Sequence, residues 1–334
     1  MIVENKLSFY IVVFGVGMLI FTGCGPSALL IQPVSARRDL EETILQRDKG
    51  LLVSDKIAMI DVDGIMSNHG SGGWFGSGEN QVSLFVEKLD KAGRDSHVKA
   101  VVLRINSPGG TVSASDMMYH TLLDFKEKSN KPVIACLLDV AASGGYYLAC
   151  GCDGILAQPS TVTGSIGTIM QTVSFAGTMK KLGIKAESIK SGEMKDMASP
   201  LHDLRAAEKE ILQGIITQFY EQFLTVVLKG RKNLDRDKLL PLADGRVFTA
   251  QGALTGGLID RIGYPADAIE WAREKANLKK VKVVIYHRPI DYKPNVYSSA
   301  MAETGLKAMI NFELPHWLRS EGPQFLYLWQ VEQD

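Results

Sequence analysis

Short apolar strands alternate with helical segments along the middle of this chain, and this alternation limits the possible folds more than any other feature. Strands are expected at 56–66, 98–106, 131–140, 153–159, the second half of 176–190, and 281–290. Helices are expected at 111–128, from about 143, in the first half of 176–190, and at about 203–228. Strands separated by helices usually pair in parallel, with the helices covering the sheet. The pattern therefore predicts an α/β domain.

Composition excludes some functions and leaves others open. The 334 residues are 46% hydrophobic, which is enough for a substantial core, and 37 basic residues balance 37 acidic ones. A nucleic-acid-binding protein would need a basic excess or a basic stripe, so none is expected here. Cys150 and Cys152 form one C-x-C pair without a second pair or a nearby histidine, which does not favour zinc. Cys136 lies in an apolar run and is expected in the core. We expect no metal and no cofactor.

The N-terminus is expected to attach the protein to a membrane. Residues 7–22 carry no charge, a length that is short for a spanning helix and typical of a signal-peptide core. The following "FTGC" is similar to a bacterial lipobox and makes Cys24 the expected lipidation site; the alternative is an uncleaved membrane anchor. Either way, the rest of the chain is tethered to a membrane of the cell envelope, outside the cytoplasm. The expected divisions are 1–23 (signal peptide or anchor), 24–50 (tether), 51–290 (main α/β domain) and 291–334 (C-terminal extension).

Three short segments could together carry nucleophilic chemistry. Ser143 lies in "AASGGYYLAC", where a strand is expected to end and a helix to begin. A serine nucleophile needs a base and an oxyanion hole. Lys195 in "SGEMKDMASP" could be that base if burial keeps its amine neutral, and Gly109 and Gly110 in "INSPGG" could expose backbone N–H groups. Each segment alone has an ordinary explanation: Ser143 as a helix cap, Lys195 as a solvated charge, and the glycines as a turn.

Five segments taken together resemble the signal peptide peptidase A family of serine proteases, peptidase family S49. They occur in the family's order: "RINSPGG", "DVAASGGYYLAC", "STVTGSIG", "KSGEMKDMASP" and "LADGRVFTAQGALTGGLID". The resemblance covers roughly residues 57–263. It implies the ClpP/crotonase-like fold of stacked ββα units, here with an N-terminal membrane-anchoring segment. A single set of motifs indicates the short, single-copy form of the family.

The resemblance also implies a role for individual residues. Ser143 is the implied nucleophile, Lys195 the general base, and Ser165 a group that orients the lysine. Gly110, and less directly Gly144, would donate backbone N–H groups to the oxyanion. The implied activity is an endopeptidase with a Ser–Lys dyad that cleaves residual signal peptides or other short or unfolded peptides through an acyl-enzyme.

The short form assembles as a ring-like homo-oligomer in which serine and lysine come from adjacent protomers, and we expect the same here. The apolar segments "DMMYH" (116–120) and "GGYYL" (144–148) fit either subunit contacts or the core of one chain. Two other functions share the fold. One is a non-catalytic, membrane-tethered scaffold, and the other is a crotonase-like enzyme acting on acyl-CoA. Neither needs Ser143, Lys195 and Ser165 together.

Overall fold

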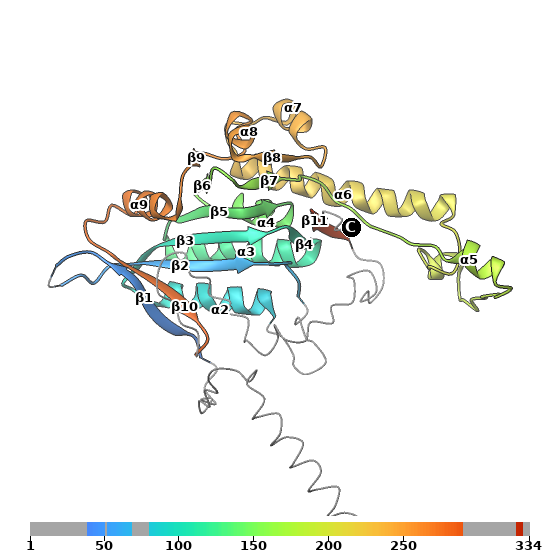
Figure 1. The fold of residues 1–334 in the computed structure, drawn as a ribbon, viewed down its shortest axis with the longest axis horizontal. Coiled ribbons are helices and arrows are strands. Elements are labelled where there is room, and N and C mark those ends of the chain that lie inside the picture. Colours follow the sequence, from blue (N-terminus) through green and yellow to red (C-terminus); the bar gives the residue numbers. More distant parts are fainter. Residues whose placement is uncertain (1–38, 51, 69–79, 290–324, 330–334) are drawn as a thin grey trace, which may run out of the picture. The chain divides into compact units, whose positions relative to one another are not determined.

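The structure, a computed structural model, describes residues 39–50, 52–68, 80–289 and 325–329 (Figure 1). The predictions on residues 1–23, including the anchor, and on Cys24 lie outside the described residues. So do those on residues 25–38 of the tether and on most of the C-terminal extension. Residues 41–47, within the expected tether, form the first strand of the domain.

A large, mostly parallel sheet forms the centre of the domain (Figure 1). Its main order is β1-β10-β2-β3-β5-β6-β9, in which only the β1–β10 pair is antiparallel. β7 pairs in parallel with the end of β5, and β8 pairs with β7. The strands are β1 (Glu41–Arg47), β2 (Lys56–Asp63), β3 (Val98–Ser107), β5 (Val133–Ala142), β6 (Gly154–Ala157), β7 (Val162–Gly164), β8 (Val247–Thr249), β9 (Arg261–Ile262) and β10 (Lys282–His287). This arrangement confirms the predicted α/β class and is consistent with the fold of family S49.

Helices cover the sheet and give it two cores. One core lies between the sheet and the helices α2, α3, α4 and α6, and the other lies under α9. Because the central strands are buried on both faces, their sequences are nearly continuous apolar runs. The helices are α2 (Gln81–Arg94), α3 (Val112–Ser129), α4 (Gly144–Ala149), α5 (Ala176–Lys181), α6 (Ala206–Gly230), α7 (Arg236–Leu239), α8 (Ala250–Thr255) and α9 (Pro265–Lys275). The described residues also form two 3-10 turns, η1 (Glu193–Asp196) and η2 (Leu240–Leu242).

Two sequence expectations are settled by this packing. Met118, Tyr119, Tyr146, Tyr147 and Leu148 are all buried, so the apolar segments on α3 and α4 belong to the core of one chain. The strand expected in the second half of 176–190 is wrong, because residues 184–190 form no strand and are exposed. Among the described residues, no strand edge lies beside this segment with which its backbone could pair.

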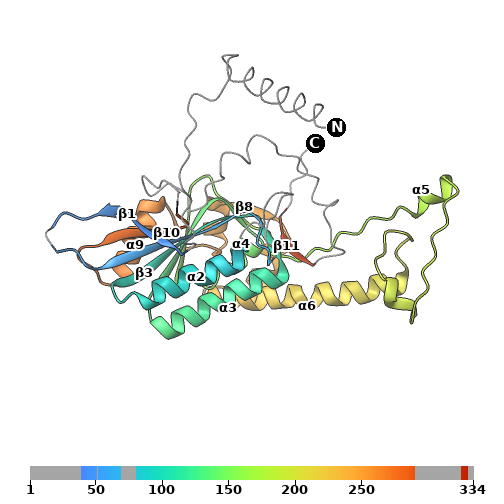
Figure 2. The same ribbon diagram turned by 90° about the horizontal axis from the view of Figure 1, so that it is seen from below.

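An exposed arm connects the sheet to α6. No residue from 170 to 205 is buried, although this stretch includes α5 and η1. Figures 1 and 2 show α5 beyond the N-terminal end of α6, away from the sheet. The arm carries large apolar side chains exposed to solvent, among them Phe175, Leu182, Ile184, Ile189 and Leu201. Among the described helices, α6 is long and apolar enough to cross a membrane, but its C-terminal half packs Phe223 and Leu224 into the core.

Candidate active site

Ser143 occupies a strained turn between β5 and α4. Its backbone has φ 52° and ψ −115°, a conformation that side-chain-bearing residues seldom adopt. Such strain typically costs 1–3 kcal/mol and persists only where neighbours enforce it. The Ser143 N–H donates to the Gly164 carbonyl at 2.8 Å, and the Ser143 carbonyl accepts from the Tyr147 N–H at 2.8 Å. The Ser143 side chain makes no cap hydrogen bond to α4, so the capping explanation does not describe this serine.

A short glycine strand, β4 (Gly109–Thr111), lies against the start of α4. Gly109 has φ 102°, which favours glycine, and a Cβ there would fall 2.7 Å from the Gly144 nitrogen. A Cβ on Gly110 would fall 1.8 Å from the Met66 carbonyl oxygen. Gly109 can lie this close to the Gly144 backbone, and Gly110 this close to the Met66 backbone, only because neither Gly109 nor Gly110 has a side chain. The turn after β3 and the turn at Ser143, far apart in sequence, therefore meet.

Ser165 lies beside the same turn. β5 and β7 pair Ala142 with Gly164, so the residues that follow these two strands are neighbours. Ser165 is nearly buried, has φ 50°, and donates its N–H to the Arg246 carbonyl at 2.8 Å. It lines a cleft of about 750 Å³ together with Thr168, Gln171, Gln213, Tyr220 and Asp244.

Lys195 lies apart from this group. It belongs to η1 on the exposed arm, and its own side chain is exposed. Among the described residues, no hydrogen bond or ion pair joins Lys195 to Ser143 or Ser165. Within one chain the structure therefore brings together Ser143, Ser165, Gly110 and Gly144, and it leaves out the expected base.

A C-terminal strand that the sequence analysis did not predict lies on β4. β11 (Leu326–Leu328) runs antiparallel to it and pairs Tyr327 with Gly110, while Leu326 bridges to Ile169 on the other side. The Tyr327 ring is fully buried and stacks on Tyr147 with ring centres 5.2 Å apart. Its hydroxyl donates to the Phe219 carbonyl at 2.6 Å. The edge beside Ser143 thus holds an extended peptide and encloses an aromatic side chain. The only sequence signal was the apolar cluster "FLYLWQ".

Two buried thiols, Cys136 on β5 and Cys150 at the end of α4, are not alternative nucleophiles. Burial raises the pKa of Cys136 to about 12 and that of Cys150 to about 12. The reactive form of cysteine is the thiolate, so both side chains stay protonated and inert near neutral pH.

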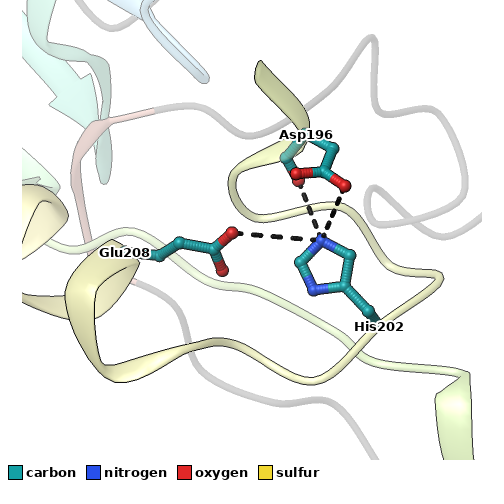
Figure 3. Close-up of side chains that lie close together, drawn as sticks. All are labelled: Asp196, His202 and Glu208. Atoms are coloured by element: carbon teal, nitrogen blue, oxygen red, sulfur yellow. Dashed lines mark hydrogen bonds and ion pairs between the residues drawn. The ribbon is translucent and has the colours of Figure 1, made fainter. Parts of the chain in front are cut away.

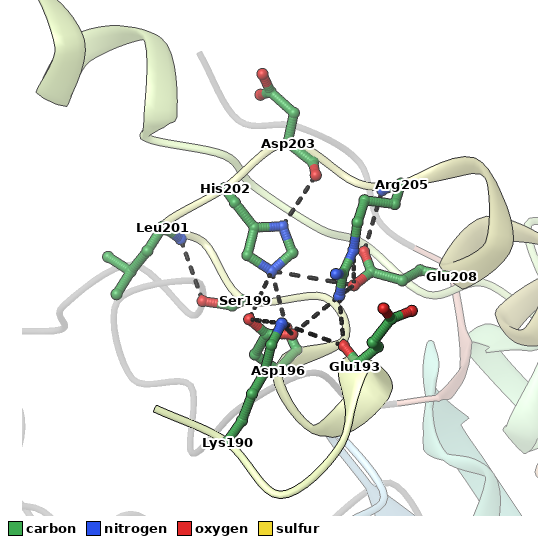
Figure 4. A network of polar contacts seen from close by, with 9 residues as sticks. All are labelled: Lys190, Glu193, Asp196, Ser199, Leu201, His202, Asp203, Arg205 and Glu208. Atoms are coloured by element: carbon green, nitrogen blue, oxygen red, sulfur yellow. Dashed lines mark hydrogen bonds and ion pairs between the residues drawn. The ribbon is translucent and has the colours of Figure 1, made fainter. Parts of the chain in front are cut away.

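A second polar cluster lies where the arm meets α6. One ligand atom each of Asp196, His202 and Glu208 lies within 4.8 Å of the others, a grouping that could hold a metal ion (Figure 3). The two carboxylates of the cluster are already paired with basic side chains. Lys190 and Arg205 donate to the Asp196 carboxylate, and Arg205 donates to Glu208 (Figure 4). The ammonium of Lys190 holds the pKa of Asp196 below its ordinary value, and Arg205 does the same for Glu208. The cluster therefore has the composition of an ion-pair network.

Both ring nitrogens of His202 face groups that can only accept a hydrogen bond. Nδ1 lies 2.9 Å from the Asp203 carbonyl oxygen, and Nε2 lies 3.1 Å from the Asp196 carbonyl oxygen. Only the imidazolium form has two N–H donors. The hydrogen bond to Asp203, followed by that to Asp196, raises the pKa of His202 above its ordinary value of 6.5.

We expect the ring of His202 to titrate with a midpoint above 6.5 in the folded protein. Because folding favours the protonated form, the protonated His202 ring stabilises the arm. This stabilisation is fully present below the pKa of His202 in the unfolded chain. It is lost as the pH rises through the pKa of His202 in the folded protein. An NMR titration of the ring signals, assigned with His202→Gln, measures the midpoint, and the same titration in denaturant gives the reference. A folded midpoint at or below the denatured one would contradict the expectation.

Comparison with known proteins agrees with this geometry. The profile described as Peptidase family S49 matches residues 125–279. A protein of Enterococcus faecium provisionally named signal peptide peptidase SppA is 36% identical over 231 residues, which cover 69% of this chain and 67% of that protein. A Synechocystis protein provisionally named a protease is 40% identical, over 68% of this chain and 77% of its own length. "Protease 4" of Haemophilus influenzae is 34% identical over 68% of this chain but only 36% of its own length.

The range matched by the family profile, residues 125–279, includes the Ser143 turn and the Lys195 arm. These matches bear out the family that the five sequence motifs indicate, and they agree with the large parallel sheet seen in the structure. The chain belongs to peptidase family S49, a family of serine peptidases.

Proposed function

We propose that this protein is a membrane-tethered serine endopeptidase in which Ser143 is the nucleophile and Lys195 of a neighbouring protomer is the general base. The observation that carries the proposal is the junction at Ser143. There, a strained serine lies beside two glycine backbones, and an extended segment lies along the same edge. β11 occupies that edge here, and a peptide that takes its place would bind by strand addition, in which main-chain hydrogen bonds give affinity and side-chain pockets give selectivity.

The chemistry is acyl transfer in two halves. The amine of Lys195 takes the proton of the Ser143 hydroxyl while Oγ bonds to the carbonyl carbon of the substrate. The N–H groups of Gly110 and Gly144 stabilise the developing oxyanion. The C–N bond then breaks, and the leaving amine receives the proton from Lys195. Water adds to the acyl-enzyme by the same steps and frees Ser143.

The exposed arm supports a base that comes from a second copy of the chain. The arm holds Lys195 away from Ser143, and its apolar side chains are left exposed by the part of the chain that the structure describes. Ser165 lines an open cleft next to the nucleophile, where a lysine from outside could enter. A closed homo-oligomer would supply the arm of one protomer to the cleft of the next.

Substrate preference follows from the surroundings of Tyr327, which a substrate side chain would enter once β11 is displaced from β4. Tyr147 and Phe223 enclose that ring, with the Phe223 ring centre 4.8 Å from it. Apolar peptides with an aromatic or large aliphatic residue fit this environment, and residual signal peptides belong to that class. Lipidation at Cys24, or an uncleaved anchor, would keep the enzyme at the membrane where such peptides remain.

The test is cleavage of a fluorogenic apolar peptide by the full-length protein in detergent. Ser143→Ala should lower kcat by at least about 10³-fold, because the acyl-enzyme can no longer form. Ser160→Ala, an exposed serine in the turn after β6, is the matched control and should stay within about twofold of wild type. A fluorophosphonate should label wild type and Ser160→Ala but not Ser143→Ala. Equal cleavage by wild type and Ser143→Ala would refute Ser143 as the nucleophile, and no cleavage above background by wild type would refute the peptidase and favour a scaffold.

A further inference from the structure

The turn that carries Lys195 has no hydrophobic support. η1 is a single 3-10 turn, and no residue from 170 to 205 is buried. Poorly buried segments open at low cost in free energy. A catalytic group must nevertheless be placed closely, since a displacement of about 1 Å can cost about 10²-fold in rate. Something other than apolar packing must therefore hold this turn.

Ionic contacts reach the backbone on both sides of Lys195. Lys190 donates to the two carboxylate oxygens of Asp196 at 2.7 and 2.8 Å, and to the Glu193 carbonyl at 3.2 Å. Arg205 donates to the Glu193 carbonyl at 2.8 Å and to the Asp196 carboxylate at 2.9 Å. His202 meets the Asp196 carbonyl at 3.1 Å. As Figure 4 shows, these side chains converge on Asp196 and on the carbonyl of Glu193.

The same arginine connects the turn to the domain. The Nε of Arg205 donates to Glu208 Oε1 at 2.8 Å, and the Arg205 backbone N–H donates to Glu208 Oε2 at 3.1 Å. Glu208 is fully buried in the first turn of α6, and the far half of α6 packs into the core. A series of contacts therefore links the core to Glu193 and Asp196, the residues on either side of Met194 and Lys195. It passes through α6, Glu208 and Arg205.

The cluster also forms ion pairs with the carboxylate of Asp196, the residue next to Lys195. Asp196 follows Lys195 directly and has Lys190, Arg205 and His202 as partners. The backbone N–H of Lys195 donates to the Gly192 carbonyl at 3.1 Å, but its amine has no hydrogen bond or ion pair with any described residue. An unneutralised Asp196 carboxylate would attract the neighbouring ammonium, whereas a base must offer a free amine.

Building on the proposed role of Lys195, we propose that Asp196 and Arg205 are positioning residues: they hold the Lys195 turn on α6 and keep its amine unpaired for the reaction. They act only through Lys195 and touch no substrate. Removing them should slow the chemical step without weakening substrate binding.

The experiment uses full-length protein in detergent and the fluorogenic peptide, with kcat and KM measured separately. Asp196→Ala should lower kcat about 10- to 100-fold and leave KM within about threefold. Asp196→Asn keeps the size and a hydrogen-bond acceptor but loses the charge, and it should lose less activity. It also provides the test if Asp196→Ala does not fold. Glu221→Ala, which breaks the exposed Arg236–Glu221 pair near the opposite end of α6, is the matched control and should keep wild-type values.

A double variant separates positioning from general stability. If Asp196 acts through Lys195, Lys195→Ala with Asp196→Ala should be no slower than Lys195→Ala alone. The proposal would be overturned if Asp196→Ala lowered kcat in the Lys195→Ala background by as much as it does in wild type. It would also be overturned if the kcat of Asp196→Ala were within about twofold of wild type. If Lys195→Ala itself kept the wild-type kcat, the assignment of the base would fail first. If Lys195→Ala were inactive while Asp196→Ala and Asp196→Asn were normal, only the positioning role would fail.

Discussion

Mixing two inactive variants, Ser143→Ala and Lys195→Ala, should restore peptidase activity. Each variant alone should lose at least about 10³-fold in kcat, since either half of the dyad is needed to form the acyl-enzyme. In a randomly mixed ring, about a quarter of the sites would pair an intact serine with an intact lysine from the next protomer. We expect this recovery because Lys195 lies on an exposed arm with no contact to Ser143 among the described residues.

The control mixes Ser143→Ala with the double variant that lacks both residues, and it should stay inactive. Subunits must be exchanged by dissociation and reassembly before the assay, and a tagged pull-down confirms that mixed oligomers form. Mixed oligomers that show no activity above the sum of the parents would place both residues of each dyad in one chain. The arm would then have to fold back onto its own domain.

Gly110→Ala should damage both the fold and the site. A Cβ at this position would lie 1.8 Å from the carbonyl oxygen and 2.6 Å from the carbonyl carbon of Met66. Both contacts are to backbone, which cannot move aside as a flexible side chain does. We expect unfolding in urea to require about 3 kcal/mol less free energy, and cleavage to fall below detection, because β4 must shift away from Ser143.

Gly214→Ala is the matched control for this change. It lies in α6 with open space around the position of its Cβ. Replacing glycine inside a helix by alanine should raise stability by about 0.5–1 kcal/mol and leave cleavage unchanged. The free energy of unfolding of Gly110→Ala could instead lie within about 1 kcal/mol of the wild-type value, with normal cleavage. The close approach of β4 to Met66 would then not be a requirement of the site.

Much of the fold could be predicted from local patterns. The apolar runs at β3 and β5 and the period of α3 and α6 gave elements close to their observed bounds, because strands buried on both faces and helices with one buried face leave regular marks. The strand expected within 176–190 failed for the complementary reason. Its residues have strand-forming character, but a strand needs a partner edge, and the arm offers none.

The sequence by itself determined which residues are candidates for the chemistry and which family the chain belongs to. Five ordered motifs name Ser143, Lys195, Ser165 and Gly110, since each motif is a local matter of residue type and spacing. The tertiary structure alone decided how they are placed. Parallel pairing of β5 with β7 brings Ser165 beside Ser143, and β4 meets α4 backbone to backbone. Lys195 lies on an exposed arm, where Arg205 donates a hydrogen bond to the adjacent Asp196. Contacts between segments far apart in the chain depend on packing, and no local pattern records them.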